Sequence, residues 1–151
     1  MTSAVLDASA LIALLRDEPG SEQVAAMLED AAMTTVNIAE VVGHYARAGA
    51  DATAIEDMLS PLPVELIGFD ETLAYQAGLM LPATKAAGLS LADRACLALA
   101  RQLGVPALTA DRAWPAVAAR LDVMVQLIRH QAAPTTEPNR STRVGPVRRR
   151  R

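Results

Sequence analysis

The chain has 151 residues, which is enough for one domain with a buried core. Hydrophobic residues make up 52% and charged residues 21%, proportions that are typical of a globular protein. The single cysteine, Cys96, excludes a disulfide framework and a cysteine-built zinc site, and two histidines are too few for a histidine metal site. Four aromatic residues do not suit a surface that stacks bases on a row of rings. Any catalysis must therefore depend mainly on carboxylates or hydroxyls.

The formal net charge of −3 combines an acidic body with a basic end. Residues 1–133 hold 8 basic and 16 acidic residues, whereas residues 134–151 hold 6 Arg and 1 Glu. From about residue 132 the composition changes to proline, threonine and arginine. We therefore predict a domain over residues 1–131 and a disordered basic tail over residues 132–151. An acidic domain needs a cation to approach nucleic acid; the tail could contact phosphate, although a merely solvated end is favoured.

No targeting segment or membrane helix is predicted. The apolar start of the chain lacks a preceding basic region and is interrupted by Asp7. No window of about 20 residues is free of both charge and proline. A cytoplasmic protein without membrane contact is expected.

The first half of the chain predicts a strand followed by helices. The apolar run at residues 4–6 predicts a buried strand that ends at Asp7, and leucines at helical spacing predict a helix over residues 8–16. Pro19 and Gly20 stop this helix. The next expected elements are a helix over 21–30, a strand over 33–35, and helices over 37–48 and 51–59.

The second half continues the alternation of strands and helices. Pro82 bends or ends a long helix that Asp70 caps, and Gly104 stops a strongly apolar helix. The expected elements, in chain order, are a strand over 64–68, helices over 70–81 and 90–103, a strand over 105–108, a helix over 111–119 and a strand over 122–128. This order predicts an α/β fold with a short, mostly parallel sheet that is covered by helices on both faces.

Four acidic residues occupy similar places in this scheme. Asp7 follows the first strand and Asp111 follows the fourth, whereas Glu40 and Asp93 lie in the predicted first turns of two helices. In open parallel sheets, ligands bind beyond the carboxyl ends of the strands. The four carboxylates are therefore candidates for one cluster.

Each acid also has an ordinary explanation at the start of a helix. Asp7 and Asp111 can accept the free amides of a first turn. Ser90 and Asp93 have capping-box spacing, and Glu40 lies at a similar spacing from Asn37. Taken singly, such acids are more often caps than ligands. Their neighbours in the sequence are apolar, however, so these acids border the core.

Four carboxylates in one cluster would repel one another. A pair ~4 Å apart costs about 4 kcal/mol at an intermediate dielectric. A hard cation such as Mg²⁺ or Mn²⁺ would neutralise the cluster, because such ions favour oxygen ligands. Waters acidified by the cation are candidate nucleophiles for phosphodiester hydrolysis.

Four segments of the chain resemble the motifs of PIN-domain ribonucleases, in the same order. Each segment carries one of the four acids. The segments are Val5–Leu15, Asn37–Val41, Leu89–Ala100 and Leu108–Trp114. The resemblance is strongest to the VapC toxins of bacterial toxin–antitoxin modules, and it extends over about residues 3–130.

The resemblance implies a three-layer α/β/α fold and an endoribonuclease that uses Mg²⁺ or Mn²⁺ and leaves a 5′-phosphate. By similarity, Asp7, Glu40 and Asp93 would be the main metal ligands and catalytic residues, and Asp111 would complete the site. RNA is the implied substrate. A cognate antitoxin protein and a second copy of the chain, in a homodimer, are the implied protein partners.

Two hydroxyl residues have a weaker claim on the site. Ser9 matches a family position that often carries a hydroxyl, where it would hold a carboxylate or a water. An ordinary residue in a first helical turn is an equally good interpretation, and the same ambiguity applies to Thr109. The family often has glycine where this chain has Ala92, which is a mild departure.

Two other functions stay open at this stage. A PIN-like module that only binds a partner would need none of the four acids. A phosphatase of the haloacid-dehalogenase type also has an aspartate nucleophile at the end of its first strand. That family requires a second aspartate two positions later, where this chain has Ser9.

Overall fold

Five short strands form one parallel sheet in a computed structural model that describes residues 1–129. The strands are β1 (Ala4–Leu6), β2 (Ala31–Thr34), β3 (Glu65–Ile67), β4 (Ala107–Thr109) and β5 (Val125–Leu127). Their order across the sheet is β3-β2-β1-β4-β5. Val5, at the centre, pairs with Ala32 on one side and with Ala107 on the other. The predicted parallel sheet is confirmed, and the order of the strands reverses between β1 and β4.

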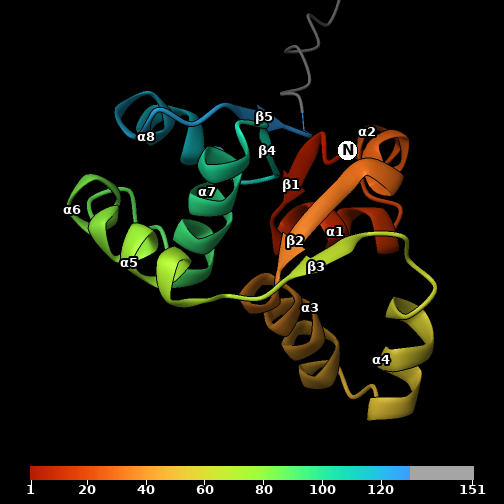
Figure 1. Cartoon of the computed structure of the whole chain (residues 1–151). Coiled ribbons are helices and arrows are strands. Elements are labelled where there is room, and N and C mark those ends of the chain that lie inside the picture. The colour runs from red at the N-terminus through yellow and green to blue at the C-terminus, as the bar shows by residue number, and fades with distance from the viewer. Residues whose placement is uncertain (130–151) are drawn as a thin grey trace, which may run out of the picture.

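Helices cover both faces of the sheet (Figure 1). They are α1 (Ala8–Leu15), α2 (Ser21–Met27), α3 (Thr35–Arg47), α4 (Ala52–Leu59), α5 (Glu71–Leu79), α6 (Leu81–Thr84), α7 (Leu91–Leu103) and α8 (Trp114–Leu121), with a short 3₁₀ helix, η1 (Leu28–Asp30), before β2. α5, α7 and α8 lie on one side of the sheet and α1 and α2 on the other, whereas α3 and α4 extend below the strands in Figure 1. The fold is the expected three-layer α/β/α arrangement.

The alternation of side chains along the strands separates two cores. Val5, with its neighbours on β2 and β4, packs in a cluster with Leu97 of α7 and Trp114 of α8. Leu6 packs on the opposite face in a cluster with Ala10 of α1 and Val24 of α2. The central strand is therefore buried on both faces, as its continuous apolar run predicts.

Side-chain caps start most of the longer helices. Each cap accepts a hydrogen bond from the amide three residues further on, which satisfies a free N–H of the first turn. The capping residues are Asp7, Thr34, Asp51, Asp70 and Ser90. Gly20 precedes α2 without a side-chain cap. Its φ of 95° favours glycine, and a β-carbon at this position would clash with the Ile128 carbonyl.

Two predicted boundaries near the acids are wrong. The second strand covers 31–34 instead of 33–35, and Thr34 caps α3, so Asn37 is not the cap and Glu40 lies in the second turn. The helix expected from Asp111 begins only at Trp114. The Asp111 side chain instead accepts the Ala113 amide in a turn, at 2.9 Å.

Within residues 1–129, no helix is both long and apolar enough to cross a bilayer. The predicted tail over residues 132–151, and the last two residues of the predicted domain, lie outside the described residues.

Candidate active site

The four predicted acids gather at the carboxyl edge of the sheet, where the strand order reverses. Asp7 follows β1, and Asp111 comes two residues after the end of β4, the strand that pairs with β1. Glu40 is carried by α3 and Asp93 by the first turn of α7, and these two helices pack together. We call these four residues the acid rim. Such switch points are where open α/β sheets bind ligands.

Asp7 is the buried member of the acid rim. Only 4% of its surface is exposed, and both carboxylate oxygens accept hydrogen bonds. Ser9 Oγ donates to Oδ1 at 2.6 Å, and the Ala10 amide donates to the same oxygen at 3.0 Å. Thr109 Oγ1 donates to Oδ2 at 2.8 Å. Asp7 is thus both a helix cap and the centre of a hydrogen-bond network that joins the ends of β1 and β4.

The two hydroxyls also hold the loop after β4. The Ala110 amide donates to Ser9 Oγ at 2.9 Å, and the Asp111 amide donates to Thr109 Oγ1 at 3.0 Å. Each hydroxyl therefore donates to Asp7 and accepts from the loop that carries Asp111. This answers the question left open by the sequence, since Ser9 and Thr109 both contact a carboxylate of the acid rim.

The other three acids are more accessible than Asp7. Asp93 is half-buried, and Glu40 and Asp111 are exposed. Asp93 forms the predicted capping box, with Oδ2 accepting the Ser90 amide at 2.8 Å. The cap and ligand interpretations are therefore compatible, because a cap occupies only part of a carboxylate. The acid rim therefore combines one buried acid, Asp7, with three acids that a ligand can reach.

Burial and mutual repulsion disfavour the charged form of three acids. Burial raises the pKa of Asp7 from 3.8 to about 6, against the opposing effect of its hydrogen bonds, and the charge of Asp93 adds to the rise. Although Glu40 is exposed as a residue, partial desolvation of its carboxyl raises its pKa, with further contributions from the charges of Asp93 and Asp7. The pKa of Asp93 is raised by burial and by the charge of Asp111. The charges of these acids therefore affect one another's pKa across the site.

Nothing in residues 1–129 neutralises this charge by an ion pair. The salt bridges found there join Arg16 and Arg129 to Glu18, away from the acid rim. The donor set consists of carboxylate and hydroxyl oxygens, which suits Mg²⁺ or Mn²⁺. In the same described region, no group of three or more acidic, histidine or cysteine side chains is arranged to hold an ion as it stands. The residues fit a hard cation in type and charge.

A polar link between two of the helices at this site was not predicted from any sequence pattern. Asn37 of α3 is fully buried, and its Nδ2 donates to the carbonyl of Ala92 on α7 at 3.0 Å. Asn37 was predicted only as a cap. The one sequence feature that could have predicted another role is Thr34, a capping residue type three positions before Asn37. If Thr34 caps the helix, Asn37 lies inside its first turn and is free to contact another element.

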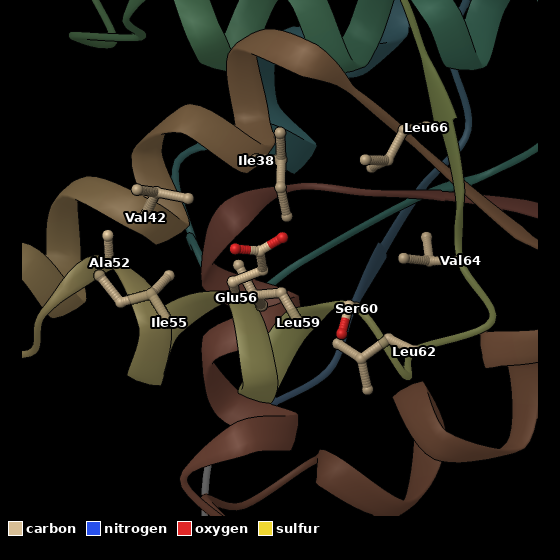
Figure 2. A pocket seen from close by; sticks show the side chains of 10 residues that line it. All are labelled: Ile38, Val42, Ala52, Ile55, Glu56, Leu59, Ser60, Leu62, Val64 and Leu66. Carbon is tan, nitrogen blue, oxygen red and sulfur yellow. The ribbon is translucent and has the colours of Figure 1, made fainter.

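A separate apolar groove lies between α3, α4 and β3 (Figure 2). Its volume is about 480 Å³. Glu56 places its carboxylate among apolar side chains in this groove. The lining residues are Ile38, Val42, Ala52, Ile55, Glu56, Leu59, Ser60, Leu62, Val64 and Leu66. The groove shares α3 with the acid rim, but Ile38 and Glu40 are two residues apart and therefore point to different sides of that helix.

Residues 4–120 match the sequence model of the PIN domain. The chain belongs to the PIN-domain family. The matched range contains all four residues of the acid rim, and the resemblance expected from the four motifs is confirmed. Membership in this family leaves the haloacid-dehalogenase alternative without support. A comparison with curated proteins finds no match.

Solved structures share the fold of this PIN domain. VapC20 from Mycobacterium tuberculosis, a sarcin-ricin loop cleaving toxin, has a TM-score of 0.64 and 19% identity, covering 76% of this chain and 94% of its own. A toxin–antitoxin complex from Klebsiella pneumoniae has a TM-score of 0.60 and 18% identity, with 74% and 90% covered. VapBC2 from Rickettsia felis, bound to a promoter DNA fragment, has a TM-score of 0.63 and 12% identity, with 83% and 98% covered. At these identities the likeness establishes the fold.

Proposed function

We propose that this PIN domain is a metal-dependent endoribonuclease and the toxin of a toxin–antitoxin module. The observation that carries the proposal is the acid rim, in which buried Asp7 faces other acids with no ion pair in the described residues. A structural relative is a toxin that cleaves RNA, which supports the choice of reaction. A module that only binds a partner would gain nothing from keeping these repelling charges.

The residues have distinct proposed roles. Asp7, Glu40, Asp93 and Asp111 would hold Mg²⁺ or Mn²⁺. When bound, the cation would supply positive charge to offset the phosphate and would lower the pKa of a water nucleophile. Ser9 and Thr109 keep Asp7 in one orientation, since each donates to a different carboxylate oxygen. The exposed acids leave the site open to a long polyanion.

The test is cleavage of total RNA by the purified protein with Mg²⁺, with Mn²⁺ and with EDTA. Asp7→Asn is compared with Asp51→Asn, because both aspartates cap a helix in the same way and asparagine caps equally well. We expect cation-dependent cleavage that Asp7→Asn lowers at least about a hundredfold, or ~3 kcal/mol, while Asp51→Asn keeps it. Equal cleavage by the two variants would show that Asp7 is only a cap. Cleavage that EDTA leaves intact would reject metal dependence.

The proposed protein partner is an antitoxin whose apolar segment occupies the groove between α3, α4 and β3. The structural relatives that are toxin–antitoxin complexes support this choice of occupant. Glu56 inside the groove would pair with a basic residue of that segment. A basic side chain could likewise enter the acid rim in place of a cation, which would silence the enzyme. A homodimer and a cytoplasmic location remain predictions.

Charge introduced into the groove should weaken inhibition without affecting cleavage. Leu66 is 50% exposed and lines the groove, whereas Met124 is 58% exposed and lies outside it. We expect Leu66→Lys to require about tenfold more antitoxin for half-inhibition, ~1.4 kcal/mol of binding, with Met124→Lys unchanged. The protein encoded beside this chain is the probe, and residual RNA cleavage is measured. Equal inhibition of both variants would place the partner elsewhere.

A further inference from the structure

Asn37 is a fully buried side chain that is bonded at one end to the N-cap of its own helix and at the other end to α7. Thr34 Oγ1, at the start of α3, accepts the Asn37 amide N–H at 3.1 Å and donates its own proton to Asn37 Oδ1. Asn37 Nδ2 donates to the Ala92 carbonyl of α7 at 3.0 Å. One side chain therefore joins α3 to α7, which are far apart in the sequence.

This bridge lies beside two acids of the rim. Asn37 comes three residues before Glu40, and residues three apart are neighbours on a helix face. Ala92 immediately precedes Asp93 in the first turn of α7. The hydrogen bond thus connects the first turn of α7, which carries Asp93, to the first turn of α3, next to the turn that carries Glu40. These carboxylates repel each other, so their separation needs to be held by something other than their own interaction.

The chemistry of the bridge allows one arrangement only. When Oδ1 accepts the hydroxyl proton of Thr34, Nδ2 faces α7. The Ala92 carbonyl can only accept, which agrees with that orientation. A buried and fully paired polar network of this kind fixes position more sharply than apolar packing does.

We propose that Asn37 is a positioning residue that sets the separation of Glu40 and Asp93 and thereby the affinity of the acid rim for a divalent cation. The inference rests on the cation site proposed above. Partners that orient metal ligands typically change metal affinity by about 10- to 100-fold when they are removed. Asn37 contacts none of the proposed ligands directly, and it acts through the backbone of the two helices that carry Glu40 and Asp93.

The test is Mn²⁺ binding without RNA, measured from the electron paramagnetic resonance signal of free Mn²⁺. Asn37→Leu keeps the branching at Cγ in a somewhat larger side chain and removes the bridge, while the Ala92 carbonyl still accepts a helical amide. Thr84→Val is the matched control, because Thr84 is also fully buried and donates to the Met80 carbonyl, outside the acid rim. We expect the Kd for Mn²⁺ to rise about tenfold in Asn37→Leu and to stay within about twofold in Thr84→Val.

Two further variants at Thr34 test the orientation of the amide. Thr34→Ser keeps the hydroxyl and should bind Mn²⁺ like the wild type, whereas Thr34→Val removes it and should bind more weakly. These variants also serve if Asn37→Leu lacks a cooperative unfolding transition. Unchanged Mn²⁺ affinity in Asn37→Leu or in Thr34→Val, whatever the loss of stability, overturns the positioning role. A wild-type protein that binds no Mn²⁺ overturns the cation site itself, which is a separate result.

Discussion

Asp7 and Asp51 start helices with the same local geometry and lie in opposite environments. Their backbone angles are nearly equal, with φ and ψ of −85° and 172° at Asp7 and −81° and 170° at Asp51. Each accepts the amide three residues ahead, at 3.0 Å and 2.8 Å respectively. Asp51 is exposed to water, whereas Asp7 is buried at the end of a central strand beside other acids. A cap motif therefore does not separate a structural aspartate from a site aspartate; the position on the sheet does.

The largest expected difference between the two caps is in stability without metal. Asp7→Asn removes a buried charge and keeps the capping oxygen, although Thr109 loses Oδ2 as its acceptor. Because the cost of the buried charge exceeds that of one hydrogen bond, the variant should stabilise the metal-free protein. A pKa raised from 3.8 to about 6 corresponds to at most about 3 kcal/mol. Asp51→Asn, at an exposed cap, should change the free energy of unfolding by less than about 0.5 kcal/mol. Urea unfolding in EDTA at pH 8 measures both.

The sign of the pH dependence follows from the direction of the shift. Because the folded protein holds the Asp7 proton more tightly than the unfolded chain, stability is lost as the pH rises from about 3.8 to 6. Above pH 6 the full cost is present, and below 3.8 it is absent. The difference between wild type and Asp7→Asn should therefore disappear near pH 4. A difference that is the same at pH 4 and pH 8 would contradict the burial of an unpaired charge.

A smaller effect is expected from the hydroxyl that distinguishes the Asp7 environment. Thr109→Val removes the bond to Oδ2 and keeps the shape of the side chain. We expect the Mn²⁺ concentration for half-maximal RNA cleavage to rise about tenfold, ~1.4 kcal/mol, because Asp7 loses part of its orientation. Thr84→Val, at an equally buried hydroxyl in α6, is the control. If the two variants shift this concentration equally, Thr109 has no role beyond packing.

The grouping of the acid rim could be predicted from the sequence, because this grouping depends on the order of strands and helices. Alternating strands and helices predict a parallel sheet, and a parallel sheet brings residues that follow its strands to one edge. Asp7 and Asp111 were placed by this argument, and the capping box of Ser90 and Asp93 was predicted by local spacing alone. These features need no knowledge of side-chain packing.

Features that depend on tertiary contacts were not predictable in this way. Thr109 donates to Asp7 across 102 residues, and Asn37 reaches Ala92 across 55. The start of α3 was misplaced because Thr34, Thr35 and Asn37 are all capping residue types, and the end of β2 at Thr34 decides among them. The apolar groove likewise forms only where α4 and β3 meet α3. In the sequence, its apolar residues cannot be distinguished from those of the core.

The central claim is that the acid rim around Asp7 binds a divalent cation. The most direct measurement is calorimetric titration of Mn²⁺ into the wild type, Asp7→Asn and Asp51→Asn at pH 7.5. The account predicts that wild type and Asp51→Asn bind with the same affinity, and that Asp7→Asn loses at least about a hundredfold, or ~3 kcal/mol. Equal binding by Asp7→Asn and Asp51→Asn, or no binding by the wild type, would contradict it.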